Sequence, residues 1–289
     1  MELVWLEDFS ALAESGNFSR AAELRHVTQP AFSRRIRSLE NWVGVDLFVR
    51  TTHGATLTDA GKHMLASAQE MTRRLHQMRQ DTREVAGKQE RTLHFAATHS
   101  LSFTFFPAWV RAAERGGPIE AVRLLSDSMT VCEQMLLQGQ VQFLLCHHFP
   151  DAPPRFAVGQ FQSKVVGSDV LLPLQAAEAD SGQSGSSLPH LAYTSESGLG
   201  RIVAARLLGE TRPPQLNTIF SSHLAAVLLS MALEGKGFAW LPRTLADAEV
   251  SAGKLQRALD EHWDIPVQIR LFRPIARLSD FAEEFWAKL

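Results

Sequence analysis

Residues 17–50 constrain the fold of this chain more than any other stretch, because they carry the pattern of two short helices joined by a tight turn. The first helix has apolar side chains at helical spacing on one face, namely Phe18, Ala21, Ala22 and Leu24. Thr28 is a favourable N-cap for the second helix, and Pro30 falls in its first turn, where a missing N–H has no helical partner to lose. The second helix keeps three apolar residues inward at spacings of four and three, namely Phe32, Ile36 and Leu39. We therefore predict a helix–turn–helix unit here.

The outer face of the second helix offers amide, hydroxyl and guanidinium groups, carried by Gln29, Ser33, Arg34, Arg35 and Arg37. Such a helix suits the major groove of DNA, where base edges present donors and acceptors. A basic stripe is more often only a solvated helix face, but this one belongs to a helix–turn–helix pattern. Two short β-prone arms around Gly54 come next and predict a hairpin wing. Its Arg50 and His53 can reach phosphate or the minor groove.

Further residues complete a known signature, which matches Phe18-Ser19-Arg20-Ala21-Ala22, Thr28-Gln29-Pro30-Ala31-Phe32-Ser33, Ile36, Leu39-Glu40, Gly44, Leu47-Phe48 and Arg50. On these residues the chain resembles the LysR-type transcriptional regulators, over its whole length and most strongly over residues 1–65. The resemblance implies an N-terminal all-α winged helix-turn-helix plus long linker helix, and a C-terminal α/β two-lobed periplasmic-binding-protein-like effector domain. It also implies sequence-specific binding to double-stranded promoter DNA, controlled by a small-molecule effector in the inter-lobe cleft.

Charge supports the DNA prediction only locally. The net charge is −2, so the whole chain is not basic, but residues 15–53 hold six arginines and three acidic residues. The residues that we expect to contact DNA are Arg20, Thr28, Gln29, Pro30, Ala31, Ser33, Arg34, Arg35, Arg37, Arg50 and His53.

A long helix should come after the wing. Thr58 is a good N-cap, and neither proline nor glycine interrupts residues 62–86. An apolar seam recurs along it at spacings of four and three, made of Met64, Ala68, Met71, Leu75 and Met78. Residues 58–86 span about 43 Å as a helix, which is longer than the small N-terminal domain can cover. We expect the seam to join two copies into a homodimer or part of a homotetramer, although a helix lying on its own domain is the alternative.

After a polar hinge, the sequence pattern is that of an α/β domain, and its strand–helix–strand spacing predicts parallel crossover connections. The predicted domains are a winged helix-turn-helix at 1–58, the linker helix and hinge at 59–89, effector lobe I at 90–161 with 266–289, and effector lobe II at 162–265.

Hydroxyl and imidazole side chains stand where several of the predicted strands end. In doubly wound sheets, ligands bind at the carboxyl ends of strands, near helix N-termini that favour anions. The residues that we expect around the effector are Thr98, His99, Ser100, Leu101, Ser126, His147, Thr194, Ser195, Ser221, Ser222 and Trp240. We expect a small anionic or carbonyl-bearing ligand, with His99 as a charge-assisting donor. The alternative is that the hydroxyl groups merely cap helices.

Three other functions compete with control by a bound ligand. Within the family, the nearest likeness is to the hypochlorite-responsive branch, on Val27–Glu40, residues 96–101 and residues 237–242, which implies sensing by side-chain oxidation. Only three methionines fall in the effector region, Met129, Met135 and Met231, and all are readily explained as core. A hydrolase is a remote alternative, because no nucleophile-elbow pattern or phosphate-binding glycine loop exists. The histidines at 99, 147, 148 and 223 lack the spacing of a metal motif, so we expect neither a metal nor a cofactor.

The remaining bulk features describe an ordinary cytoplasmic protein, associated with the nucleoid when bound to DNA. No apolar run is long enough for a membrane span, and the first residues lack the basic start of a signal peptide. Cys132 and Cys146 lie in apolar surroundings and are expected to be buried, inert thiols.

Overall fold

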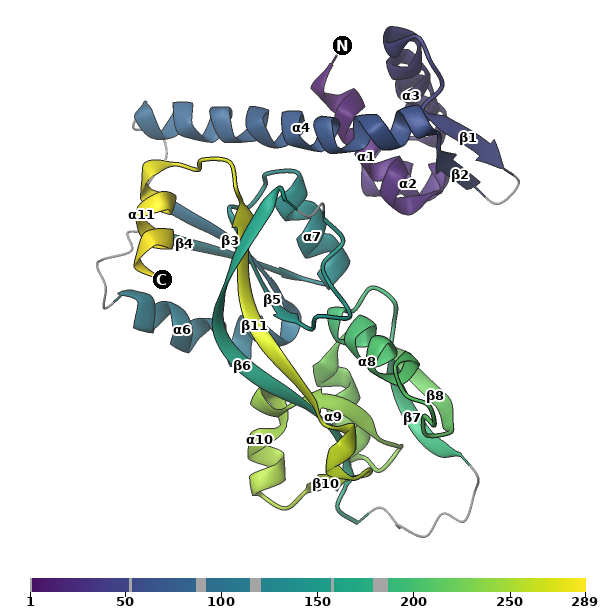
Figure 1. Ribbon diagram of the computed structural model, residues 1–289, viewed down its shortest axis with the longest axis vertical. Coiled ribbons are helices and arrows are strands. Elements are labelled where there is room, and N and C mark those ends of the chain that lie inside the picture. Colours follow the sequence, from purple (N-terminus) through teal and green to yellow (C-terminus); the bar gives the residue numbers. More distant parts are fainter. Residues whose placement is uncertain (1, 52–53, 87–91, 115–120, 157–158, 179–186) are drawn as a thin grey trace. The chain divides into compact units, whose positions relative to one another are not determined.

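The computed structural model describes residues 2–51, 54–86, 92–114, 121–156, 159–178 and 187–289 (Figure 1). Two compact units divide the chain, one built from the first 89 residues and the other from nearly all of the rest. The expected hinge, the wing tip with His53 and most of the loop at 178–187 lie outside the described residues. No helix in the described part is long and apolar enough to cross a lipid bilayer.

The N-terminal unit opens with α1 (Leu3–Ser15), which is followed by the two predicted helices, α2 (Phe18–Leu24) and α3 (Gln29–Val43). Their inner faces share one core, which includes the fully buried Phe9, Leu12, Phe32, Ile36 and Leu39. The side chain of Asn17 begins α2 by accepting from the backbone N–H groups of Ser19 and Arg20, at 2.9 and 3.1 Å. Thr28 precedes α3 in an extended conformation but makes no side-chain capping bond, so the prediction of that bond is wrong.

The wing is a hairpin of β1 (Phe48–Thr51) and β2 (Gly54–Leu57), paired antiparallel. Gly54 takes a φ of +140°, and a Cβ there would lie 2.2 Å from the carbonyl oxygen of Gly16. That carbonyl accepts a hydrogen bond from the backbone N–H of Ala55 at 2.7 Å. A glycine is therefore required where the wing joins the end of α1.

Helix α4 (Asp59–Val85) begins as predicted, with the hydroxyl of Thr58 accepting from the N–H of Gly61 at 3.0 Å. Ala68 is only 1% exposed and belongs to the hydrophobic core of the N-terminal unit of its own chain, and Met64 packs against the same core. Ala68 cannot contact a second copy there, and its inclusion in the dimer seam was wrong. The other three seam residues, Met71, Leu75 and Met78, are 52%, 40% and 59% exposed.

In the C-terminal unit, the first lobe is a sheet with helices on both faces. Its strands run in the order β4 (Ala121–Asp127), β3 (Thr92–Thr98), β5 (Phe143–His148), β11 (Ile265–Pro274) and β6 (Phe161–Ala176). β3 is parallel to β4 and β5, as the crossover rule predicts. One face packs against α6 (Phe106–Ala113) and α11 (Asp280–Lys288), and the other against α7 (Met129–Leu137).

Two helices follow β3, namely α5 (His99–Thr104) and α6. The break falls at Phe105, just before Pro107 in the first turn of α6. Proline has no N–H to continue the helical ladder, so the chain turns and starts a second helix.

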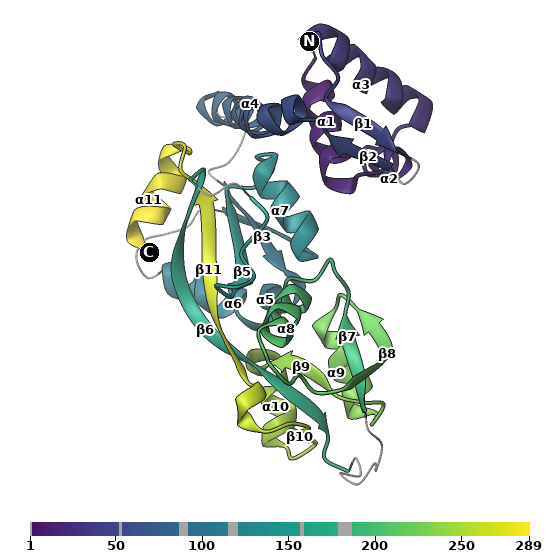
Figure 2. The ribbon, with the colours of Figure 1, turned by 45° about the vertical axis from the view of Figure 1, so that its right-hand side comes forward.

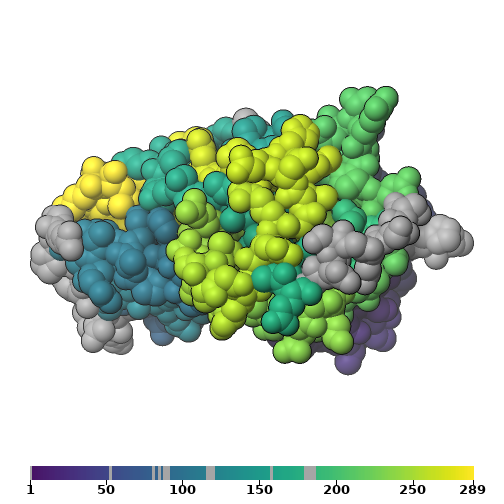
Figure 3. All heavy atoms as spheres, turned by 90° about the horizontal axis from the view of Figure 1, so that it is seen from below, coloured from purple at the N-terminus to yellow at the C-terminus, as the bar shows by residue number. Residues whose placement is uncertain are grey.

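The two long strands β6 and β11 pair antiparallel from Phe161↔Pro274 to Leu171↔Ile265 and run from the first lobe into the second (Figures 1 and 2). Further along β6 its partners are β9 (Ala239–Pro242) and β10 (Leu255–Arg257). Helix α10 (Arg243–Ser251), between them in sequence, had no counterpart in the prediction. It contributes to the yellow-green surface in Figure 3.

A parallel pair of strands, β7 (Leu188–Tyr193) and β8 (Leu216–Ser222), extends the second lobe. Helix α8 (Gly198–Leu208) connects β7 to β8, helix α9 (Ala225–Leu233) connects β8 to β9, and η2 (Glu261–Trp263) precedes β11. One core of this lobe gathers Phe238, Trp240, Trp263 and Ile265. The ends of β3, β4, β5 and β8 and the start of α8 bring polar residues from both lobes together.

Candidate functional site

The polar face of α3 and the wing form a shallow hollow in the N-terminal unit. Its walls are Gln29, Pro30, Ser33, Arg34, Arg37 and Arg50. The amide Nε2 of Gln29 donates to the hydroxyl of Ser33 at 3.0 Å, which fixes both side chains along the helix. Three guanidinium groups and an amide on one surface can bind phosphates and read base edges. Six of the eleven residues predicted to contact DNA therefore meet on one face.

Arg50 is held in place by an aromatic ring. Its guanidinium carbon lies 4.5 Å from the ring centroid of Phe18. Phe18 is itself fixed by an edge-to-face contact with the buried Phe32, at 6.1 Å between centroids. A stacked arginine keeps its charge and its N–H groups, so Arg50 is oriented without being neutralised.

The neighbouring Arg35 points elsewhere. Its Nη1 lies 3.3 Å from Oδ2 of Asp8, whose side chain is completely buried in α1. Asp8 also accepts from Nε of Arg25 at 2.9 Å, so one carboxylate ties α1 to both helices of the helix–turn–helix. Arg35 does not border the hollow, and its contact with Asp8 gives it a structural role, while its contact with DNA stays a prediction. No local sequence pattern points to Asp8, because its partners are 17 and 27 residues away.

The other predicted DNA contacts are scattered. Arg20 and Thr28 are exposed and Ala31 is half-buried, but none of them borders the hollow, and His53 lies outside the described residues.

Glu7 links α1 to α4 within the N-terminal unit, since its Oε1 lies 3.0 Å from Nε2 of His76.

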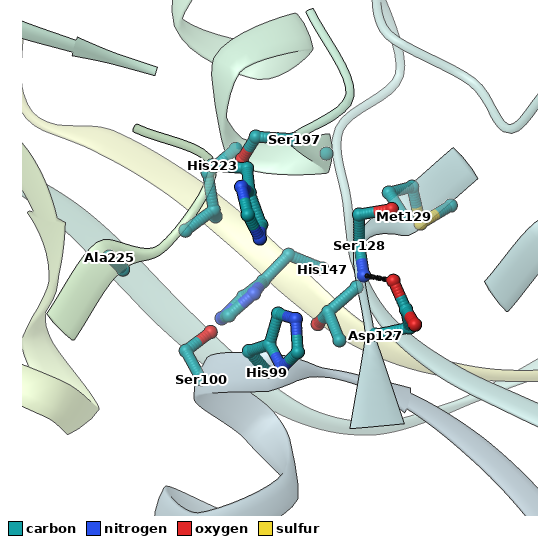
Figure 4. Close-up of a pocket in the computed structure, with 12 residues that line it drawn as sticks. His99, Ser100, Asp127, Ser128, Met129, His147, Ser197, His223 and Ala225 are labelled. Atoms are coloured by element: carbon teal, nitrogen blue, oxygen red, sulfur yellow. Dashed lines mark hydrogen bonds between the residues drawn. The ribbon is translucent and has the colours of Figure 1, made fainter. Parts of the chain in front are cut away.

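A small cavity lies between the two lobes of the C-terminal unit (Figure 4). It is lined by Thr98, His99, Ser100, Asp127, Ser128, Met129, His147, Ser197, Gly198, Leu199, His223 and Ala225. These residues stand at the ends of β3, β4 and β5 and at the starts of α5, α7, α8 and α9. The carboxyl ends of the strands therefore form the site, as the rule for α/β sheets requires.

Three imidazole rings face this cavity. The side chains of His99, His147 and His223 converge in Figure 4, and the rings of His99 and His223 are 5.7 Å apart. Ser126 does not line the cavity, but its hydroxyl lies 3.2 Å from Nδ1 of His99. Burial lowers the pKa of His99, with Asp127 acting against that shift and His223 adding to it. This lowered pKa disfavours the charged form of His99, and the charge-assisting role of this residue stays a prediction.

Four of the eleven predicted effector residues line the cavity: Thr98, His99, Ser100 and His147. Leu101 is fully buried in the core of the first lobe, and the indole Nε1 of Trp240 donates to the carbonyl of Trp263 at 2.9 Å inside the second. Both predictions were wrong, because an apolar residue next to a strand end turns into the core.

The other predicted residues of the second lobe stay outside the cavity walls. They are Thr194, Ser195, Ser221 and Ser222. The hydroxyl of Ser222 accepts from the N–H of Leu224 at 3.1 Å in the turn before α9, and α9 has no side-chain cap. The serine that the second lobe contributes to the cavity wall is instead Ser197, whose hydroxyl accepts from the N–H of Gly200 at the start of α8. Ser197 is the residue that the prediction missed by choosing the strand end itself rather than the helix start.

An ion pair joins the two helices α7 and α8, whose first residues line the cavity. Arg201 of α8 donates through both Nη atoms to the carboxylate of Glu133 on α7, at 2.9 Å, and its Nη2 also bonds the hydroxyl of Thr130. The two side chains are only 13% and 4% exposed. Burial raises the pKa of Glu133, and Arg201 opposes that shift. The partners are 68 residues apart in the chain, which hides the pair from sequence patterns.

The cavity is small. Its volume is about 30 Å³, which holds a water-sized occupant but no aromatic acid. In the part of the chain that the structure describes, no three His, Cys, Asp or Glu side chains are arranged to hold a metal ion. Both cysteines are buried, and burial raises the pKa of Cys132 to about 12, so this thiol is a poor nucleophile.

Comparison with known proteins agrees with this division. Residues 3–62 match the model of bacterial regulatory helix-turn-helix proteins of the lysR family, and residues 86–289 match the LysR substrate binding domain. The chain is 31% identical to the HTH-type transcriptional regulator YjiE of Escherichia coli (strain K12), across 100% of this chain and 94% of the relative.

Two solved full-length structures are also similar. One is Vibrio fischeri DarR in complex with DNA, at 30% identity and a TM-score of 0.56, covering 99% of this chain and 97% of the other. The other is HypT from Salmonella typhimurium, described as a hypochlorite-specific LysR-type transcriptional regulator. It has 30% identity and a TM-score of 0.57, and covers 99% of this chain and 96% of its own.

Proposed function

The chain belongs to the LysR family of bacterial transcriptional regulators, and we propose that it binds its promoter as a homodimer under the control of a small anion held between the two effector lobes. The anionic effector rests on one observation, a cavity of about 30 Å³ faced by three imidazole rings.

DNA binding is supported by the hollow on α3. Arg34, Arg37 and Arg50 present three positive charges beside the amide of Gln29. Arginine and amide side chains make the commonest bidentate contacts to guanine and adenine in the major groove. Footprinting of the full-length protein on the DNA upstream of its own gene tests this part. A protein that protects no site at low salt would contradict it.

Dimerisation is supported by the three exposed seam residues of α4. Met71, Leu75 and Met78 are spaced by four and three, as on the contact side of a coiled coil, and large apolar side chains at 40–59% exposure favour a partner helix. A second copy of the same helix fits this spacing. A tetramer would need further contacts, which these three residues do not provide.

Several features favour an anion over a neutral ligand. Imidazole and hydroxyl groups line the cavity, and the N-terminus of α8, an eleven-residue helix, opens beside it at Ser197 and Gly198. Ser100→Ala removes one donor from the wall and is expected to weaken the transcriptional response to the effector while leaving operator affinity unchanged. Footprints of the variant at full strength, with reporter output insensitive to the effector, are the expected result.

Oxidant sensing is a second candidate, favoured by one observation. Met129 lines the cavity and also belongs to the buried core of the first lobe, whereas Met135 and Met231 pack against the cores without lining the cavity. Hypochlorite would transfer its oxygen to the thioether, giving methionine sulfoxide and releasing chloride. Met129→Leu separates the two hypotheses. It abolishes the response if oxidation is the signal, and leaves it nearly intact if a bound anion is the signal.

We also propose a cytoplasmic regulator without catalytic activity. The relatives that it matches are regulators, and the two thiols of the chain are buried. A hydrolase screen with ester and amide substrates is expected to give no turnover.

A further inference from the structure

A buried carboxylate lies directly behind the effector cavity. Asp169, on β6, is 6% exposed and does not line the cavity itself. Its Oδ2 lies 3.1 Å from Nε2 of His147, which does line the cavity and comes from β5, on the other side of β11. Figure 4 shows the ring of His147 directed toward His99 and Ser100. One nitrogen of His147 is thus bound to Asp169, and the other is left for the cavity.

The remaining bonds of Asp169 hold it in the charged form. Thr244, at the start of α10 in the second lobe, donates to it through its hydroxyl at 2.6 Å and its backbone N–H at 3.2 Å. The N–H of Val170 donates at 2.8 Å. Burial alone would raise the pKa of Asp169, but the bonds from His147, Thr244 and Val170 bring it below its usual range. The carboxylate is therefore ionised at neutral pH.

A buried anionic carboxylate favours a cation beside it. His147 is the titratable side chain that the structure bonds to Asp169. The other charged or titratable groups around the cavity act differently: burial lowers the pKa of His99, His223 belongs to the exposed surface, and Asp127 is an acid. Arg243 and Asp247 border Asp169 from α10 in a second pocket, where they pair with each other at 3.6 Å. Asp127 already accepts from the N–H of Ser128 at 2.7 Å.

We propose that Asp169 is a positioning residue that makes His147 the anion-recognising group of the cavity, so that the site selects a small monovalent anion. The inference rests on the proposed effector function and names its ligand class. Asp169 fixes the tautomer and favours the imidazolium form, and the second nitrogen of His147 donates to the ligand. Asp127 in the same wall repels a second negative charge, which disfavours sulfate and phosphate.

Bromide is a suitable probe, because it is monovalent, small and locatable by anomalous scattering. Thermal unfolding of the full-length protein is measured in sodium bromide and in sodium sulfate of equal ionic strength, from about pH 5 to pH 8. For the unmodified chain, we expect bromide to raise the Tm more than sulfate does. The gain should shrink as the pH rises and His147 loses its proton. Anomalous density beside His147 in crystals grown with bromide identifies the site.

Asp169→Asn keeps the shape of the side chain and removes its charge. We expect the pH midpoint of bromide binding to fall by about one unit, which is a roughly tenfold loss of affinity near pH 7. Thr244→Val is the matched control, because it removes one hydrogen bond of Asp169 and leaves the charge. It should keep the midpoint within a few tenths of a unit of the unmodified chain. His147→Gln serves if the Asn variant does not fold, and its bromide binding should be weak and independent of pH.

Failure of the effector proposal and failure of the role of Asp169 are distinguishable. If the unmodified chain gains nothing from bromide at any pH and its crystals hold none, the proposed anion effector falls, and this inference falls with it. If it binds bromide but Asp169→Asn or His147→Gln keeps the original pH profile, the effector proposal stands and the role of Asp169 is overturned. The same holds if Thr244→Val shifts the midpoint as far as Asp169→Asn does, because the effect would then be structural.

Discussion

Arg34 and Arg35 are adjacent arginines of α3 for which the structure predicts opposite consequences of substitution. Arg34 is exposed and borders the DNA-facing hollow. Arg35 is bound to the buried carboxylate of Asp8, which also holds Arg25. Arg34→Ala should therefore weaken DNA binding without changing stability, and Arg35→Ala should lower stability and leave the hollow intact.

The magnitudes depend on exposure and partners. Loss of one bidentate base contact costs about 1–3 kcal/mol of binding, or roughly 5- to 150-fold in affinity. Removing one partner of a fully buried pair costs about 3–5 kcal/mol, but Arg35 is 34% exposed and Asp8 keeps Arg25, so we expect about 1 kcal/mol for Arg35→Ala. Asp8→Ala leaves Arg35 unpaired and Arg25 with Glu7 as its partner, and costs about 2–3 kcal/mol, because both guanidiniums can still be hydrated.

Two assays are applied to each variant. Urea unfolding gives its stability, and fluorescence anisotropy on operator DNA gives its affinity at a fixed salt concentration. Arg34→Lys is the control for charge, since it keeps the phosphate attraction and loses the bidentate geometry. The reasoning is refuted if Arg35→Ala loses as much DNA affinity as Arg34→Ala while its unfolding midpoint stays unchanged.

Two further predictions concern the linker and the cleft. Leu75→Glu sets two like charges across the seam of α4, so light scattering should show a monomer at micromolar concentration. Leu75→Met is the control and should remain dimeric. A Leu75→Glu variant that is still dimeric would show that the interface is not on α4. Glu133 has a raised pKa in the folded state, so the folded chain binds more protons than the unfolded one and the contribution of Glu133 to stability falls as the pH rises above its ordinary pKa of 4.5. Glu133→Gln should flatten that part of the stability–pH curve measured by urea unfolding, and an unchanged slope would show that Glu133 does not titrate there.

Local signals in the sequence were enough for the N-terminal unit. The spacing of Phe32, Ile36 and Leu39 and the position of Pro30 predict α3 because they depend only on residues within a turn or two of one another. The seam was predicted less well. A heptad pattern tells which side of a helix is apolar but not what covers it, and Ala68 is covered by the head of its own chain. The same limit applies to Trp240, whose apolar surroundings in the second lobe come from Phe238, Trp263 and Ile265 rather than from a ligand.

The candidate site was predicted as a place but not as a set of residues. The rule that strand ends form the site led to Thr98, Ser100 and His147. The pairs that give the site its electrostatics join residues far apart in the chain: His147 with Asp169, 22 residues on, and Glu133 with Arg201, 68 residues on. A sequence pattern at helical or strand period cannot detect such pairs, because their spacing is set by how the strands are ordered in the sheet.

The position of the cavity between the two lobes constrains how a ligand can act. The ion pair of Arg201 and Glu133 joins α8 of the second lobe to α7 of the first, so an equilibrium between closed and open lobes makes and breaks this pair. A ligand shifts such an equilibrium only by the difference between its affinities for the closed and open forms. In the closed form it contacts groups from both lobes at once, since His147 and Ser100 belong to the first and Ser197 and His223 to the second. In the open form it keeps at most one of these sets. The anion is therefore expected to favour the closed form, and weakening the ion pair through Arg201→Met should lower the apparent affinity for bromide even though Arg201 does not line the cavity.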